Sequence, residues 1–293
     1  MAMEFLPQIM ISGAQVGCIY AMMALSYFVI LSATGILNFA QGEWMMLSAV
    51  LGVVLLGLGL PYPIAILVSV AATIAVCQFF EWSVIRPLQR RNADMTILVV
   101  ALLGILVVVR YSVGLTFGRE DVPIPGAFEP TPIILGSSAF IQPQTLVIYV
   151  ATALTFGALW LFLQRTWFGR SFRIAAVDPI GAQVVGVNLA RIRFGSFAIG
   201  AAIAAILGWL YAPLYAAGYG IGAAPGVKGF IALLVGGVGS PWGSLAGGML
   251  LGLFEVATAY YVGSLWSEGI GFALLMVFLI FWPSGLLGGM RGR

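Results

Sequence analysis

The chain has 293 residues, of which 61% are hydrophobic and 8% are charged, and its formal net charge is +3 at pH 7. Soluble domains contain about 25% charged residues, so this composition excludes a soluble domain and predicts an all-α polytopic membrane protein. The sequence has no histidine, which excludes histidine-based metal sites and proton relays. We expect one membrane domain over residues 1–293 without metal or cofactor, and we attribute the positive charge to loop arginines, not to nucleic-acid binding.

Nine apolar runs follow one another along the chain. Each is a candidate for a transmembrane helix, although the run near residue 230 is too short to cross a bilayer core of about 30 Å unaided. The runs are residues 5–32, one ending near 58, one ending near 84, 95–115, 145–163, 194–217, 227–238, one beginning at 241, and 265–282.

The second run begins with the segment GILNFAQGEWMML. Asn38 and Gln41 have the spacing of an N-cap residue and its N3 partner, and Glu43 lies in the first turn, where the helix dipole favours an acid. The first N–H groups of a helix lack partners within the helix. We therefore expect these three residues to line a route through the membrane.

Two longer polar segments interrupt the apolar pattern. Residues 117–144 contain several acids and prolines with one arginine, which is typical of the outer side of a membrane, and residues 133–141 favour a short strand pair. Residues 164–193 contain five arginines and one acid. Because short loops rich in arginine stay in the cytoplasm, we expect this second segment to be a cytoplasmic coupling loop.

The C-terminal arginines Arg291 and Arg293 also indicate the cytoplasmic side. An odd number of crossings must then separate them from the loop at 164–193, so the short run at 227–238 is counted as a crossing. This count predicts about nine crossings with the N-terminus outside, and eight crossings are the alternative.

Glycine dominates residues 218–254. Ser240 followed by Pro241 is a pair that starts a helix, directly after the short run that ends at Gly236. Two helices that meet at a glycine-rich break are typical of a transport path, so Ser240 is a further candidate for a path-lining residue. The spacing of the neighbouring glycines predicts close helix packing; they are Gly239, Gly243, Gly247, Gly248 and Gly252.

Further ionisable residues lie within or at the ends of apolar runs. A carboxylate at mid-depth is costly, so Glu255 is expected either to tie two helices together or to line the path. We expect Arg110 and Lys228 to extend toward the membrane surface, with Lys228 the partner of Glu255 if that residue forms a tie. Glu81 is expected to anchor the interface by pairing with Arg86.

A short helix with its own capping residues lies within the cytoplasmic loop. Asp178 is a good N-cap, Pro179 suits the first helical position, and Gly186 suits the position after the last turn. Such a short helix is marginal in water and must pack against something. It is either a connector on the protein surface or a docking helix for a soluble subunit, and only docking predicts that Gly181→Trp abolishes transport while the chain folds normally.

The docking interpretation assigns a coupling role to a set of loop residues, and the arginines beside them could pair with acids of the partner or with anionic lipid. The coupling residues are Arg173, Ala176, Asp178, Gly181, Ala182, Val185 and Gly186. No GxxxxGK[ST], GxSxG or HExxH motif occurs in the sequence, so the chain is not expected to be an enzyme or to hydrolyse ATP through a P-loop.

Four segments, in order along nearly the whole chain, resemble bacterial branched-chain amino acid permeases of the LivH type. They are GILNFAQGEWMMLSA, EWSVIRPL, RSFRIAAVDPIGAQVVGVN and GFIALLVGGVGSPWGSLAGGMLLGLFE. Gln41 stands where that family usually has histidine. An imidazole is therefore not available at this position, and the substrate need not be the usual one.

The resemblance implies the permease subunit of an ATP-driven, binding-protein-dependent importer with the fold of ABC importer permeases, in the inner membrane of a bacterium. In that family two similar permeases pair, two ATPase subunits dock from the cytoplasm, and a binding protein delivers the substrate from outside. Members carry branched-chain amino acids, urea, short amides or aromatic acids. The alternative is a stand-alone channel or ion-coupled carrier, which would transport without ATP or a partner.

Overall fold

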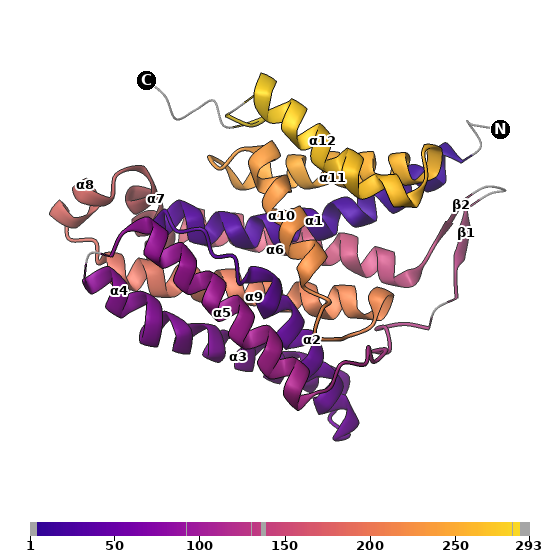
Figure 1. The fold of residues 1–293 in the computed structure, drawn as a ribbon, viewed down its shortest axis with the longest axis horizontal. Coiled ribbons are helices and arrows are strands. Elements are labelled where there is room, and N and C mark those ends of the chain that lie inside the picture. Colours follow the sequence, from indigo (N-terminus) through magenta and orange to yellow (C-terminus); the bar gives the residue numbers. More distant parts are fainter. Residues whose placement is uncertain (1–4, 92, 130, 136–138, 283, 288–293) are drawn as a thin grey trace. The chain divides into compact units, whose positions relative to one another are not determined.

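The structure is a computed structural model that describes residues 5–287 apart from 92, 130, 136–138 and 283. These residues form α-helices, one π-helical turn and a two-stranded sheet (Figure 1). The elements are α1 (Leu6–Thr34), α2 (Gln41–Gly57), α3 (Tyr62–Phe80), η1 (Glu81–Ile85), α4 (Arg86–Arg90), α5 (Met95–Thr116), β1 (Ile133–Leu135), β2 (Ala139–Ile141), α6 (Pro143–Arg165), α7 (Trp167–Val177), α8 (Pro179–Val184), α9 (Leu189–Tyr215), α10 (Ala223–Gly236), α11 (Pro241–Tyr261) and α12 (Ser264–Phe281).

Every apolar run predicted from the sequence coincides with one of these helices. Six helices in the described part of the chain are long and apolar enough to cross a membrane: α1, the continuous segment Tyr62–Arg90, α5, α6, α9 and α11. The helices α2 and α10 are apolar but shorter. The prediction of a polytopic helical membrane protein is therefore confirmed at this level.

The chain divides into two compact units. Unit 1 contains Met1–Leu25, Pro125–Phe156 and Val227–Arg293, and unit 2 contains Ser26–Ile124 and Gly157–Gly226. Each unit is built from segments that are far apart in the sequence, and α1, α6 and α10 each contribute residues to both. The prediction of a single membrane domain stays a prediction.

The core of unit 2 is formed by α2, α3 and α9, which pack on one another. The indole N–H of Trp209 on α9 donates to the Ser69 hydroxyl on α3 at 2.6 Å, and the Tyr62 ring lies edge-on to the same indole. Gly208 lets α9 approach α2 closely, because a Cβ at this position would collide with the Met45 carbonyl. A buried hydrogen bond of this kind contributes about 1 kcal/mol to stability, so Trp209 helps to fix α9 against α3.

In unit 1, glycines let α11 pack closely on α1. A Cβ on Gly248 would collide with the backbone of Ala21, and a Cβ on Gly252 would collide with that of Gly17. A Cβ on Gly247 would likewise collide with the backbone carbonyl of Ala232 on α10. The prediction of close helix packing is confirmed for Gly247, Gly248 and Gly252, and small residues are what such packing in a membrane requires.

The strand pair expected over residues 133–141 is also present. β1 and β2 run antiparallel, with Ile133 opposite Ile141. The amide N–H of Phe140 donates to the Gln8 side chain at 2.9 Å, which attaches the hairpin to the first turns of α1.

Candidate functional site

The start of α2 brings together two of the predicted path residues. The Asn38 amide nitrogen donates to the Gln41 side-chain oxygen at 3.1 Å, and both residues are buried. The side-chain oxygen Oδ1 of Asn38 accepts from the Ala40 N–H at 3.1 Å, and α2 begins only at Gln41 with Ala40 as its N-cap. The expectation that Asn38 is the N-cap is therefore wrong. An asparagine whose side chain accepts from the N–H two residues ahead stabilises a turn, and here α2 begins only after this turn.

Glu43, in the first turn of α2, forms an ion pair with Arg110 on α5. The Arg110 Nε donates to Oε1 of Glu43 at 3.1 Å, and the terminal Nη2 bonds the same oxygen. The expectation that Arg110 extends toward the membrane surface is wrong, because a buried carboxylate needs a cation beside it. Within the described residues, Oε2 of Glu43 and the amide nitrogen of Gln41 are buried without a hydrogen-bond partner. These two groups could therefore bind a water molecule or a polar solute.

The predicted tie between Glu255 and Lys228 is confirmed. Lys228 Nζ on α10 donates to Oε1 of Glu255 on α11 at 2.5 Å, and both side chains are mostly buried. Tyr20 on α1 donates its hydroxyl to Oε2 of Glu255 at 2.9 Å, and Lys228 lies 5.6 Å from the centre of the Tyr20 ring. One carboxylate thus joins three helices of unit 1, and Lys228 does not extend to the surface as an independent anchor.

Glu255→Gln and Lys228→Met are each expected to destabilise the protein, by about 3 kcal/mol, because each leaves one buried charge without its partner. The double variant should recover part of this loss. Tyr20→Phe removes one hydrogen bond only and should cost about 1 kcal/mol. Thermal unfolding in detergent measures all four variants, and strictly additive losses from the two charge changes would contradict the tie.

Ser240 starts α11 as the sequence predicted. Its hydroxyl accepts from the Trp242 N–H at 3.2 Å, with Pro241 at the first helical position. The preceding helix α10 ends at Gly236, and Gly237 has a φ of +92°, which glycine adopts without strain. Ser240 belongs to unit 1 and Gln41 to unit 2. That these residues line one path therefore stays a prediction.

Glu81 begins the π-helical turn η1 and pairs with Arg193 on α9. The Arg193 Nε donates to Oε1 of Glu81 at 2.5 Å, and the Nη1 of Arg193 bonds the Gln89 side chain. The expectation that Glu81 pairs with Arg86 is wrong. Side chains that face each other on an α-helix are three or four residues apart, so the spacing of five between Glu81 and Arg86 does not bring their side chains together, and Arg193 of the packed helix α9 is the partner instead.

The arginine-rich loop at 164–193 folds into two helices, α7 and α8. Asp178 caps α8 by accepting from the Ile180 N–H at 3.0 Å, and Gly186 follows the last turn with a φ of +83°. The predicted short helix is confirmed, but α7 was missed. Thr166 accepts from the Gly169 N–H at 3.0 Å and caps α7. A threonine followed by apolar residues at helical spacing was the sequence signal for it.

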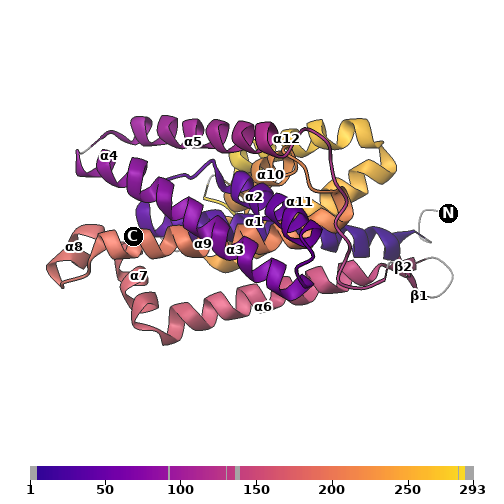
Figure 2. The same cartoon turned by 90° about the horizontal axis from the view of Figure 1, so that it is seen from below.

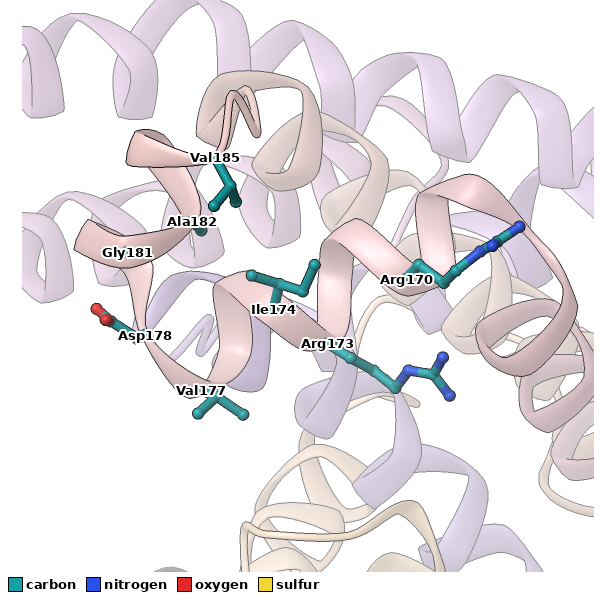
Figure 3. Close-up of a pocket in the computed structure, with 8 residues that line it drawn as sticks. All are labelled: Arg170, Arg173, Ile174, Val177, Asp178, Gly181, Ala182 and Val185. Atoms are coloured by element: carbon teal, nitrogen blue, oxygen red, sulfur yellow. The ribbon is translucent and has the colours of Figure 1, made fainter.

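A groove of about 610 Å³ lies between α7 and α8 (Figure 3). Ile174 of α7 and Val185, the residue directly after α8, point into it, and Arg170 and Arg173 extend from α7. Arg173 also bonds the Gln164 side chain. The groove therefore has an apolar centre with two arginines at one end and the Asp178 carboxylate at the other (Figure 3).

The outer side of α8 carries exposed apolar side chains. Ile180 is 77% exposed and Val184 is 83% exposed. Ala182, in contrast, is fully buried, and Gly181 is half-buried with the Asp178 carboxylate beside its Cα. The small residues Gly181 and Ala182 thus let α8 pack on its own chain. Apolar side chains that face water in a polar loop are typical of a contact with another protein.

The family model described as branched-chain amino acid transport system / permease component matches residues 9–280. This match covers almost the whole chain. The chain belongs to this permease family. The permease is 31% identical over 97% of its length to the high-affinity branched-chain amino acid transport system permease protein LivH of Salmonella typhimurium, covering 96% of that protein.

Two further comparisons also cover nearly the whole chain. The permease is 32% identical over 96% of its length to the high-affinity branched-chain amino acid transport system permease protein BraD of Pseudomonas aeruginosa, covering 95% of it. A chain in the solved structure of PsaBC from Streptococcus pneumoniae in complex with Fab has a TM-score of 0.51 with 12% identity, over 94% of the permease and 91% of that chain. The similarity to this PsaBC chain concerns the fold alone.

Two ion-pair residues, Arg110 and Arg193, and the hydrogen-bond donor Tyr20 were not identified as site residues from the sequence of the permease. Arg110 and Lys228 are the basic residues inside the apolar runs, and Glu43 and Glu255 are the acids deepest within them. Matching these two bases with these two acids would have predicted both ion pairs. Tyr20 gives no such signal, because a tyrosine in an apolar helix is common.

Proposed function

We propose that the permease is the transmembrane subunit of an ATP-driven, binding-protein-dependent importer of branched-chain amino acids or of a related small amide or organic acid. The observation that carries this proposal is the full-length relationship to LivH and BraD, whose names state high-affinity branched-chain amino acid transport. ATP is hydrolysed in separate subunits, because the sequence contains no P-loop.

Two cytoplasmic ATPase subunits, a second homologous permease and an external binding protein complete the importer. The α7–α8 groove and the exposed side chains Ile180 and Val184 support an ATPase contact. Neither α7 nor α8 is among the helices that could span a membrane. Closure of the ATPase pair would move α7 and α8 and, through them, the adjoining helices α6 and α9, since α7 and α8 both pack on α9.

The solute passes the polar groups at the start of α2. The orphaned Gln41 amide and Glu43 carboxylate oxygen support this role, because buried polar groups without partners are suited to transient hydrogen bonds. Glutamine offers both a donor and an acceptor, so amides and urea fit here as well as amino acids. Ser240, at the break between α10 and α11, and Glu255, inside α11, complete the proposed route.

The permease lies in the inner membrane of a bacterium with its arginine-rich loop and its C-terminus in the cytoplasm. Nine crossings, with the N-terminus outside, satisfy the positive-inside pattern, and α2, α10 and α12 are then counted as crossings. Cysteine labelling at residues on either side of α10 tests this arrangement.

Co-purification tests the proposal. The tagged permease, expressed together with the genes beside its own, should elute with an ATPase subunit and a second permease. If the permease instead eluted without partners and, by itself, transported the solute without ATP, it would be a stand-alone carrier and the importer proposal would be overturned.

A further inference from the structure

A second hollow in unit 2, which the proposed transport route does not use, lies between the end of the segment α3–η1–α4 and the start of α9. Its volume is about 440 Å³, within the range of small-molecule sites. Arg86 of α4 and Arg191 and Arg193 of α9 line it, together with Glu81 and the α9 cap residue Asn188.

The charge of this hollow is positive. Glu81 neutralises Arg193 through their ion pair. Arg86 and Arg191 have no ion-pair partner among the residues that the structure describes. Two guanidinium groups are thus left to face the hollow, and arginine is well suited to bind phosphate because its planar group can donate two hydrogen bonds at once.

The start of α9 adds to this attraction for anions. α9 is 27 residues long, and Asn188 caps it by accepting from the Arg191 N–H at 3.1 Å. The N-terminus of a long helix carries a partial positive charge that favours an anion. The helix end and the two arginines therefore act in the same direction.

The position of the hollow indicates where the anion comes from. Most of its lining comes from the ends of two membrane-spanning candidates, the segment Tyr62–Arg90 and α9 (Figure 2). Phe168 of α7 completes the lining. Trp82, next to Glu81, is 60% exposed, and Phe194 at the rim is 50% exposed. Tryptophan beside arginine at a helix end is typical of the membrane–water interface. The α7–α8 groove differs, because neither of its helices is a spanning candidate.

We propose that this hollow binds the headgroup of an anionic phospholipid, with the phosphate held by Arg86 and Arg191. The Glu81–Arg193 pair forms the inner wall, and Trp82 and Phe194 contact the lipid at the glycerol level. Its lining residues differ from those of the α7–α8 groove and of the proposed transport route, so the site stands whichever solute the permease carries. A phospholipid bound in this way would anchor the cytoplasmic end of α9 in the inner leaflet.

Native mass spectrometry of the full-length permease, with any partners that co-purify, tests the proposal. The protein is titrated with phosphatidylglycerol and, separately, with phosphatidylcholine. Binding of phosphatidylglycerol should saturate at one tight site per chain and should be stronger than that of phosphatidylcholine. Arg86→Gln with Arg191→Gln should weaken it by about thirtyfold, since each arginine near a lipid surface contributes about one factor of five to six.

The matched control is Arg90→Gln with Arg91→Gln, which removes the same charge from exposed positions outside the hollow. This control should bind like the wild type. Equal loss in both double variants would show a diffuse charge effect and overturn the site. Equal binding of the two lipids by the wild type would overturn it even if the Arg86 and Arg191 variant did not fold.

Two further titrations distinguish the source of the anion. Inorganic phosphate and glycerol 1-phosphate should each fail to displace phosphatidylglycerol at comparable concentration, because they lack the apolar contacts. Displacement by either one would show a site for a soluble anion and contradict the lipid assignment. Loss of the lipid whenever an ATPase subunit is bound would assign Arg86 and Arg191 to that partner's acids instead.

Discussion

Val184→Arg in α8 is expected to abolish solute uptake while the permease still folds and inserts into the membrane. Val184 is 83% exposed, so little packing is lost within the chain itself. At the proposed ATPase contact, however, the valine would be buried, and its loss there costs about 1.5 kcal/mol before the cost of burying an arginine. ATPase binding should therefore weaken by more than about tenfold. Co-elution of the ATPase and uptake by whole cells measure both effects.

Gln183→Arg is the matched control, because it adds the same charge to the same helix at an exposed polar position. It should retain most of the uptake. Wild-type uptake by Val184→Arg at normal expression would show that α8 is a passive connector. The sequence alone pointed to Gly181→Trp for this test, but a Cβ at Gly181 would collide with the Asp178 carboxylate that caps α8. That substitution would disturb the helix as well as any contact.

Arg110→Met is expected to destabilise unit 2 by about 3–5 kcal/mol, because it leaves the buried Glu43 carboxylate without a cation. Most of the protein should then be lost during expression or solubilisation, and uptake should fall with it. Adding Glu43→Gln should restore much of the stability, since the buried charge is then absent. Fluorescence-detected size-exclusion chromatography after heating gives the midpoint of unfolding for each variant.

Arg119→Met is the control for Arg110→Met, because Arg119 is an exposed arginine just beyond the end of α5. Its unfolding midpoint should match that of the wild type. If Arg110→Met were equally stable, the ion pair with Glu43 would not contribute to the fold. If the double variant were stable but transported nothing, Glu43 would act in transport beyond its structural role.

The helices and their ends could be predicted because they depend on local chemistry. Long apolar runs favour helices wherever the backbone must satisfy its own hydrogen bonds in lipid. Asp178 with Pro179, and Ser240 with Pro241, begin helices because a capping oxygen and a fixed φ act within three residues. Asn38 was the exception, because the same side chain can stabilise a turn or a helix start, and the spacing does not distinguish them.

Side-chain partners that are distant in the sequence were the hardest to predict. Glu81 was expected to pair with the near neighbour Arg86, yet it pairs with Arg193, which is 112 residues away. These two groups come together because α3, which leads directly into η1, packs on α9. The pair Glu255 and Lys228 was predictable because a mid-membrane acid needs a base and few bases lie within the apolar runs. Which groups then face the transport path depends on how the two units and their partners assemble.

Uptake into liposomes tests the central claim most directly. The permease and its co-eluting partners are reconstituted, the binding protein is added outside, and ATP is enclosed within. Radiolabelled leucine should accumulate only when both ATP and the binding protein are present, and Val184→Arg should reduce accumulation to the level seen without ATP. Accumulation that proceeds without ATP, or with the permease alone, would contradict the account.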